Sequence, residues 1–460
     1  MVFSSNIFLV FFLPGALALY YLTPRRHRNT ALLLESLVFY GWGEPIYLLL
    51  MLFTIALNYV FGLRIAQRRA EGQSAKPALA WAVVLNLGLL AWFKYAGFLA
   101  RTLRLLPGLG ALPVPAIALP IGISFYIFQS LSYTIDVYRG DTQAQKNFLR
   151  FGTYVSMFPQ LIAGPIVRYR DIAEQLEGRR ESSGQFASGV TLFILGLSKK
   201  LLIANPIGAL WEAMRGQPGC LSAWAGMFAY TLQLYFDFSG YSDMAIGLGR
   251  MFGFEFLPNF NYPYIARSVT EFWRRWHISL STWFREYLYI PLGGNRRGLP
   301  RQLLNLLIVW MLTGLWHGAS WNFVLWGAYY ALLLMGEKLL GGRITERLWR
   351  PLRHLGLLLI VSFGWMLFYF ESMPELLAFL GRLFRPDTTP LHTRYQLLAY
   401  LPLLFFAALA ATPLLRRWAQ RVLSRPAGGA LRVLVPALLL LLCLAALASQ
   451  SYNPFIYFRF

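Results

Sequence analysis

Charged residues are scarce in this sequence, and acidic residues are the scarcest of them. Charged side chains make up 13% of the 460 residues and hydrophobic ones 57%, whereas soluble domains carry roughly 25% charged residues. A soluble chain this apolar could not cover its surface with polar groups. The composition therefore excludes an ordinary soluble domain and indicates a protein of the lipid bilayer. Because no internal repeat or change of composition divides the chain, we expect residues 1–460 to form a single membrane domain.

The shortage of acidic residues leaves a formal net charge of +22, from 42 Lys and Arg against 20 Asp and Glu. In a soluble protein such an excess would suggest nucleic-acid binding. Here the basic residues lie mainly in short runs between apolar stretches, as the positive-inside rule describes, so we expect membrane lipids and no nucleic acid as partners. The basic run at residues 25–28 predicts a cytoplasmic first turn and an N-terminus outside. Residues 1–6 lack the positive charge of a signal peptide.

Apolar stretches approaching the 20 or so residues of a membrane helix recur along the whole chain. We predict an all-α polytopic membrane protein with roughly 10 to 13 membrane segments, including re-entrant pieces and interfacial helices. The predicted spans are residues 7–22, 31–61 (broken near Gly43-Glu44-Pro45), 79–99, 117–137, 186–210, 223–252, 303–316, 321–340, 354–370, 397–415 and 431–448.

Prolines interrupt one apolar stretch, and polar residues enrich another. Residues 158–165 carry two prolines and a glycine. This predicts either a re-entrant loop that lines a cavity or a loop just outside the bilayer, because irregular backbone within a membrane must be buried in protein. Residues 270–298 are more polar than a lipid-facing helix.

Cysteine and histidine are too few and too scattered to form the common metal sites. The two cysteines, Cys220 and Cys443, form no CxxC pair. The chain also lacks the GxSxG, P-loop, HExxH and Gly-rich dinucleotide motifs. We therefore expect no bound metal and no bound cofactor.

One of the five histidines stands out. His317 follows the apolar residues 303–316, directly after Trp316 and before Gly318. Ionisable residues within membranes are functional candidates because their burial is costly. A buried imidazole stays neutral, and a neutral imidazole can take a proton from a hydroxyl group as a general base. The alternative is a histidine that caps the helix C-terminus among lipid headgroups. Polar or arginine-rich neighbours predict interfacial or solvated positions for His27, His354 and His392.

A second histidine lies in the polar stretch. Read as one helix, this stretch places Trp273, His277 and Ser281 on one face and pairs Glu271 with Arg275. Such a face could join His317 at a cavity of imidazole, indole and guanidinium groups, which would suit a thioester whose carrier bears phosphates. The alternative is an amphipathic helix in the membrane interface.

Two acidic residues interrupt an apolar run that also holds Gln233 and Ser239. Asp237 and Asp243 do not share a helix face, so a catalytic carboxylate pair is not expected. We interpret them as structural supports, buried against arginine side chains or backbone amides.

These residues belong to motifs that resemble the membrane-bound O-acyltransferases, in their bacterial alginate O-acetyltransferase branch. Two of these specific motifs hold the histidines: Phe272-Trp273-Arg274-Arg275-Trp276-His277-Ile278-Ser279-Leu280-Ser281 and Gly314-Leu315-Trp316-His317-Gly318-Ala319. The others are at residues 1–6, 119–126, 135–140, 158–165, 235–249, 291–296 and 453–460. The resemblance therefore covers nearly the whole chain.

The resemblance implies an activity and the residues that perform it. His317 matches the catalytic histidine of the family, and His277 the second active-site position. The donor would be acetyl-CoA at the bacterial inner membrane, and the acyl group would pass through a central tunnel. An extracytoplasmic partner of the SGNH-hydrolase type, within a polysaccharide biosynthesis complex, would place it on a secreted or envelope glycan. Candidate donor contacts and tunnel walls are Trp273, Arg274, Arg275, Trp276, Asn295 and Trp316.

Other functions remain compatible with the residues alone. Within the enzyme class these are O-acetylation of peptidoglycan, D-alanyl transfer to teichoic acid, and acylation of a lysophospholipid or sterol. Outside it, the chain could be a transporter of an anionic glycan or lipid, or a membrane scaffold. Transporters often show inverted repeats, which this sequence lacks.

Overall fold

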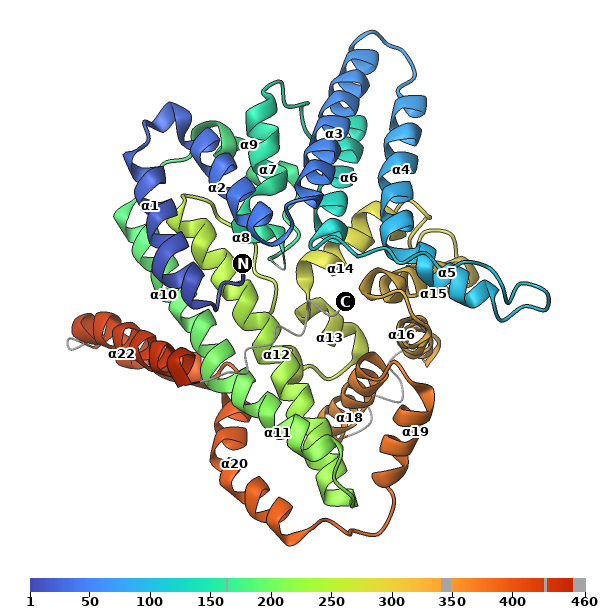
Figure 1. The fold of residues 1–460 in the computed structure, drawn as a ribbon, viewed down its shortest axis with the longest axis vertical. Coiled ribbons are helices and arrows are strands. Elements are labelled where there is room, and N and C mark those ends of the chain that lie inside the picture. Colours follow the sequence, from blue (N-terminus) through green and yellow to red (C-terminus); the bar gives the residue numbers. More distant parts are fainter. Residues whose placement is uncertain (163, 341–348, 426–427, 450–460) are drawn as a thin grey trace. The chain divides into compact units, whose positions relative to one another are not determined.

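Helices make up all the regular structure that the computed structural model describes, which covers residues 1–162, 164–340, 349–425 and 428–449 (Figure 1). The all-α prediction is confirmed. Seven helices are long and apolar enough to cross a membrane: Tyr47–Ala70, Lys76–Leu103, Ser183–Arg215, Trp321–Leu340, Arg350–Tyr369, Leu391–Ala410 and Gly428–Ser449. A shorter apolar helix spans Ile7–Leu22. The chain is a multi-pass membrane protein; the predicted total also counted short and re-entrant pieces.

The chain divides into two compact units. Unit 1 comprises Met1–Phe193 and Met244–Leu257, and unit 2 comprises Ile194–Asp243 and the described residues from Pro258 onward. Two helices, α10 (Ser183–Ser198) and α12 (Cys220–Met251), contribute residues to both units. The single domain over residues 1–460 stays a prediction.

Unit 1 contains the N-terminal helices. The predicted break near Gly43-Glu44-Pro45 is present, because α2 ends at Gly43 and α3 begins at Tyr47. Its helices are η1 (Ile7–Phe12), α1 (Leu13–Leu22), η2 (Arg25–His27), α2 (Arg28–Gly43), α3 (Tyr47–Ala70), α4 (Lys76–Leu90), η3 (Ala91–Tyr95), α5 (Ala96–Leu103), α6 (Ile123–Arg139), α7 (Phe148–Ser156), α8 (Phe158–Leu161) and α9 (Tyr169–Gly178).

The proline-interrupted stretch of unit 1 forms the short helix α8, whose four residues are all buried. Its first residue, Phe158, packs against the rings of Phe12 and Phe39 at centroid distances of 5.3 and 5.4 Å. Protein thus surrounds the part of this stretch that forms α8, as the prediction for interrupted backbone within a membrane requires. Two parts of the predicted motifs, Ala163 and residues 453–460, lie outside the described residues.

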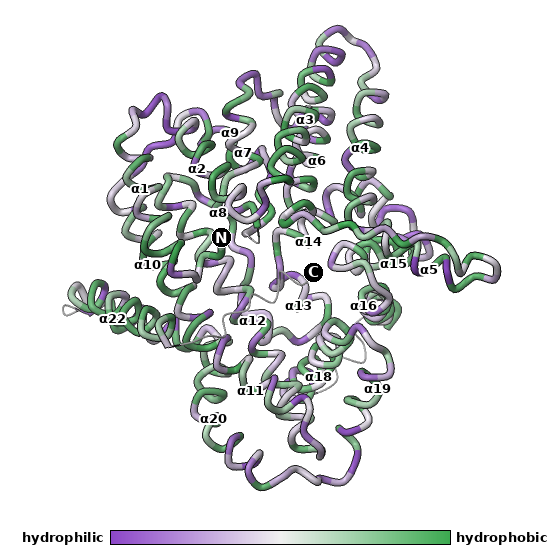
Figure 2. The backbone as a smooth tube through the Cα atoms, viewed as in Figure 1, coloured by the Kyte–Doolittle hydropathy of each residue, from purple (hydrophilic) through white to green (hydrophobic). Residues whose placement is uncertain are grey.

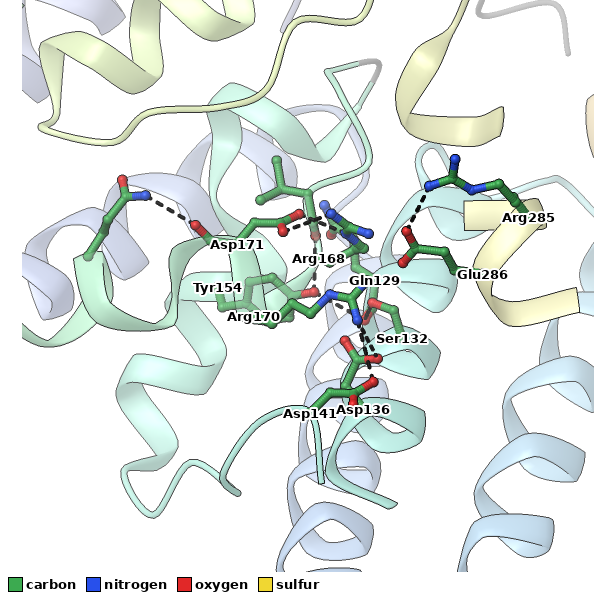
Figure 3. Close-up of polar contacts among 12 residues, drawn as sticks. Gln129, Ser132, Asp136, Asp141, Tyr154, Arg168, Arg170, Asp171, Arg285 and Glu286 are labelled. Atoms are coloured by element: carbon green, nitrogen blue, oxygen red, sulfur yellow. Dashed lines mark hydrogen bonds and ion pairs between the residues drawn. The ribbon is translucent and has the colours of Figure 1, made fainter. Parts of the chain in front are cut away.

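Unit 1 also holds a cluster of ion pairs (Figure 3). The Arg168 guanidinium donates to both carboxylate oxygens of Asp171, at 2.8 and 2.9 Å. Arg170 lies 3.4 Å from Asp141 and 3.8 Å from the buried Asp136. These pairs join α6, α9 and the connection between α6 and α7, and each cation lies opposite an acid.

Unit 2 contains the remaining helices and both candidate histidines. These helices are η4 (Lys199–Ala204), α11 (Asn205–Arg215), η5 (Pro263–Ile265), α13 (Val269–Arg275), α14 (Ile278–Phe284), η6 (Arg285–Tyr289), α15 (Leu299–His317), α16 (Trp321–Leu340), α18 (Arg350–Tyr369), α19 (Met373–Arg382), α20 (Leu391–Ala410), α21 (Leu414–Leu423) and α22 (Gly428–Ser449). Figure 2 shows hydrophobic residues along most of α22, which has the highest mean hydropathy of the seven candidate spans, 2.6.

Candidate active site

Close packing of α15 against α16 positions His317 (Figure 1). A Cβ atom on Gly314 would collide with the carbonyl oxygen of Phe323, and one on Gly327 with that of Trp310. The two helices therefore meet where neither has a side chain, as small residues allow in membrane proteins. His317 is the last residue of α15, since Gly318 adopts an extended conformation with φ −164° and ψ 157°.

Aromatic rings surround the His317 side chain, which is 6% exposed. The ring centroids of Trp316, Trp326 and Phe368 lie 5.1, 5.1 and 5.3 Å from that of His317, each ring nearly perpendicular to the imidazole. The imidazole also lines a cavity of about 10 Å³, which is close to the lower limit for one water molecule. The other residues lining the cavity are Leu234, Phe238, Trp276, Trp326, Trp365 and Phe368.

The structure contradicts the prediction of one continuous helix through His277. Helix α13 ends at Arg275, His277 adopts the left-handed conformation with φ 45° and ψ 55°, and α14 begins at Ile278. Trp273, His277 and Ser281 therefore do not form a single helix face. This conformation is uncommon for residues other than glycine, and such local strain is often found at functional sites.

Asn259 accounts for this break. Its backbone carbonyl accepts the Ile278 N–H at 2.9 Å, and its side-chain oxygen accepts the Ser279 N–H at 3.1 Å. These two amides belong to the first turn of α14, where helix N–H groups lack intrahelical partners. Asn259 therefore caps a new helix directly after His277.

The same Asn259 side chain determines the protonation of His277. Its Oδ1 lies 3.2 Å from Nδ1 of His277. Because a backbone N–H can only donate, the Asn259 atom that faces Ser279 must be the oxygen, and an oxygen can only accept from His277. The proton is thus assigned to Nδ1, and Nε2 keeps its lone pair. Burial lowers the pKa of His277 from its ordinary 6.5 to about 3, because low dielectric disfavours the imidazolium.

Two aromatic side chains connect the histidines. The Trp316 ring lies 6.2 Å from the ring of His277 and 5.1 Å from that of His317. Phe238 packs 4.8 Å from His277 and also lines the cavity beside His317. Unit 2 thus brings both imidazoles to the same group of aromatic rings.

The other predicted contacts divide into two groups. Trp276 lines the cavity, and the buried Trp273 packs 4.7 Å from Trp310 in the same aromatic group. Arg275 makes the predicted pair with Glu271 at 2.9 Å. Arg274 and Asn295 are exposed and do not line the cavity.

The two acidic residues of α12 pair with consecutive lysines of η4. Asp237 lies 2.6 Å from Lys200, and both side chains are almost fully buried; Asp243 lies 2.5 Å from Lys199. The partner is thus lysine in each case, whereas arginine side chains or backbone amides were predicted. A buried charge is tolerated when it is paired, so the buried pair supports the interpretation of Asp237 as structural, and the partly exposed Asp243 makes an ion pair of the same kind.

Sequence reasoning missed several residues of the site. Asn259 is an isolated amide in the connection after α12, and its position 18 residues before His277 follows no helical spacing. The cavity residues Trp326, Trp365 and Phe368 occur in apolar helices, where aromatic residues look like ordinary core. Among the residues that the structure describes, no three His, Cys, Asp or Glu side chains are grouped to hold a metal ion.

A family model and several known proteins are similar to this chain, and they agree on its family. The family model described as membrane-bound O-acyltransferase matches residues 143–377. The chain is 42% identical to the probable alginate O-acetylase AlgI of Pseudomonas putida and 43% identical to that of Azotobacter vinelandii, over the full length of each chain. It is 34% identical to the peptidoglycan O-acetyltransferase of Helicobacter pylori, over 73% of this chain and 70% of that protein.

Proposed function

Since the chain belongs to the membrane-bound O-acyltransferase family, and is thus an acyltransferase, we propose that it is an acetyltransferase for an exopolysaccharide of the alginate type. It takes acetyl from cytoplasmic acetyl-CoA and carries it across the bacterial inner membrane for O-acetylation of the polymer. The observation that carries this proposal is the full-length similarity to two proteins named as alginate O-acetylases.

His317 is the proposed centre of the reaction. As a general base it would take the proton of the acceptor hydroxyl while the carbonyl carbon of the acetyl group is attacked. As a nucleophile it would instead carry the acetyl group transiently. In both routes the thiolate of coenzyme A leaves. His277, with its lone pair on Nε2, would orient a substrate or accept a proton, and Asn259 would hold it in that tautomer.

The size of the cavity beside His317 favours a short acyl group as the substrate. Its volume of about 10 Å³ and its six apolar neighbours leave little room next to the imidazole. A fatty-acyl chain would have to displace several indole rings, whereas the methyl of an acetyl group requires a much smaller adjustment. The walls of Trp276, Trp326 and Trp365 would also exclude water that could hydrolyse the thioester.

The remaining steps of the proposal concern the far side of the membrane. The N-terminus lies outside, and an extracytoplasmic partner of the SGNH type receives the acetyl group and places it on the polysaccharide within a biosynthesis complex.

Arg274, Arg275 and Asn295 are proposed contacts of the donor, and the exposure of Arg274 and Asn295 makes them accessible to its phosphates.

A transfer assay tests the donor and acceptor together. The purified protein is placed in vesicles with acetyl-CoA labelled in the acetyl group on one side, and with the candidate partner and unacetylated alginate on the other. We expect label on the alginate only when protein, partner and acetyl-CoA are all present. Consumption of D-alanyl carrier protein instead, or of no donor at all, would contradict the proposal.

O-acetylation of peptidoglycan is the second candidate, because of the similarity to the Helicobacter pylori enzyme. The same vesicles, supplied with peptidoglycan fragments in place of alginate, distinguish the two. Transfer to the fragments and not to alginate would assign the enzyme to the cell wall.

A further inference from the structure

Helix α21 (Leu414–Leu423) has two different faces and lies between two candidate membrane spans, α20 and α22. Successive residues of a helix are 100° apart, which divides its ten residues cleanly. Arg416, Arg417, Gln420 and Arg421 form one face, and Leu414, Leu415, Trp418, Ala419, Val422 and Leu423 form the other. None of these residues is buried, and Leu414 and Trp418 are 55% and 65% exposed.

The arginines of α21 have no acidic residue on their own part of the chain. Asp387 is the last acidic residue of the sequence, and it pairs with Arg394 at 2.9 Å. None of Arg416, Arg417 and Arg421 forms an ion pair with any other residue that the structure describes. Arg425 and Arg432 follow closely and add to the positive charge. No acidic residue that the structure describes therefore neutralises this helix.

The position of α21 restricts which anions can lie beside it. It follows the end of α20 and precedes the start of α22, so it connects two candidate spans on one side of the bilayer. An amphipathic helix with exposed Trp and Leu on one face and Arg on the other lies in the plane of the interface, with its apolar face in the lipid. The arginines are then at the depth of the lipid phosphates.

We propose that α21 is an interfacial helix that binds acidic phospholipids, with Arg416, Arg417 and Arg421 contacting the headgroup phosphates. The concentration of arginines at this end of α20 and α22 places it in the cytoplasmic leaflet. Phosphates pair with guanidinium through charge-assisted hydrogen bonds, and juxtamembrane basic segments are attracted to acidic lipids. This binding is independent of the acyl-transfer reaction proposed above.

Lipid selectivity of the full-length protein tests the proposal. The protein is reconstituted in phosphatidylcholine vesicles, and the association of spin-labelled phosphatidylglycerol is compared with that of spin-labelled phosphatidylcholine. The wild type should prefer phosphatidylglycerol. The triple variant Arg416→Gln, Arg417→Gln, Arg421→Gln should lose at least about fivefold of this preference, the effect of roughly one basic contact. The triple arginine-to-lysine variant should keep most of it.

A matched variant controls for net charge alone. Arg25→Gln, Arg64→Gln, Arg296→Gln also removes three exposed arginines, all outside α21, and should keep most of the preference. The proposal is overturned if the α21 glutamine variant binds phosphatidylglycerol like the wild type, or if the control loses as much. Capture of an acidic protein by α21 without any lipid preference would also overturn it.

Discussion

The ion-pair cluster of unit 1 and the histidine site of unit 2 differ in the partners that surround their polar side chains. In unit 1, Arg168 and Arg170 each lie opposite carboxylates, so the charges are neutralised within the fold. In unit 2, His277 and His317 lie among aromatic rings, and the polar groups beside Nδ1 of His277 include the neutral amide of Asn259 and the hydroxyl of Ser279. The ion pairs connect elements of the fold, whereas a buried neutral imidazole keeps a lone pair that is available to a substrate.

After His317, removal of the second imidazole, that of His277, should have the largest effect on the reaction. We expect His277→Ala to lower acyl transfer by about 10- to 100-fold, as the loss of a group that orients the reacting partners does, while the protein still inserts and folds. The matched control is His392→Ala, because His392 is exposed on α20. Initial rates in proteoliposomes give the comparison, and a His277→Ala rate within about twofold of the wild type would remove His277 from the site.

Enlarging the cavity should change which acyl group is accepted. Phe368→Ala, or the milder Phe368→Leu, removes a wall beside His317. We expect the rate with butyryl-CoA relative to acetyl-CoA to rise by about tenfold or more, since one methylene in a fitted pocket changes discrimination by roughly that factor. Competition between the two donors measures the ratio.

Phe379→Ala is the matched control for this change. Phe379 is equally buried in unit 2 but packs on Trp211 and Phe370, away from the cavity. Both Phe→Ala variants should lose stability, by about 3–5 kcal/mol, and only the change at position 368 should alter selectivity. Equal effects at both positions would mean that the cavity does not set acyl length.

The tautomer of His277 can be tested at its partner. We expect Asn259→Ala to lower transfer by about tenfold, as the loss of a partner that orients a functional histidine does. The exposed Asn261, two residues on, supplies the control variant Asn261→Ala. Proton NMR of a histidine-labelled sample should show the Nδ1–H of His277 in the wild type and its loss in Asn259→Ala; an unchanged tautomer would refute the assignment.

The low pKa of His277 predicts a particular pH dependence. With a folded pKa of about 3, His277 stays neutral and should produce no acid limb in the transfer rate between about pH 5 and 8. The unfolded state, with the ordinary value of 6.5, binds the extra proton, so this group lowers stability as pH falls below 6.5 and contributes nothing above it.

Asn259→Asp should reverse that behaviour. A carboxylate opposite Nδ1 favours the imidazolium and raises the pKa of His277, so transfer should fall as pH drops through the raised value. The rate profiles of the wild type and of the aspartate variant measure this directly. Superimposable profiles would mean that Asn259 does not control the imidazole.

The smallest effect on the reaction is expected in unit 1. Asp136→Asn removes a carboxylate opposite Arg170, which should lower stability by about 1–3 kcal/mol and leave the transfer rate per folded molecule close to that of the wild type. Thermal unfolding and initial rates, measured on the same preparation, separate the two. A large fall in rate at unchanged stability would show that this cluster takes part in the reaction.

Features that depend on neighbouring residues in the chain could be predicted from the sequence. Features that depend on contacts between distant residues could not. The apolar stretches, the break before Tyr47 and the unusual setting of His317 depend on neighbours in the chain. The left-handed turn at His277 depends on Asn259, which no periodicity connects to it. The cavity residues Trp326 of α16 and Trp365 of α18 come together only through the packing of these helices. No sequence feature separates either residue from a lipid-facing one.

The proposed reaction depends most on His317, and acetyl transfer by the His317→Ala variant tests this role most directly. Wild-type protein, His317→Ala and the control His392→Ala are reconstituted side by side and supplied with acetyl-CoA labelled in the acetyl group and with the same acceptor system. We predict that His317→Ala inserts and melts like the wild type but transfers label at least about 10²-fold more slowly, while His392→Ala is unaffected. Transfer by His317→Ala at the wild-type rate would contradict the central claim.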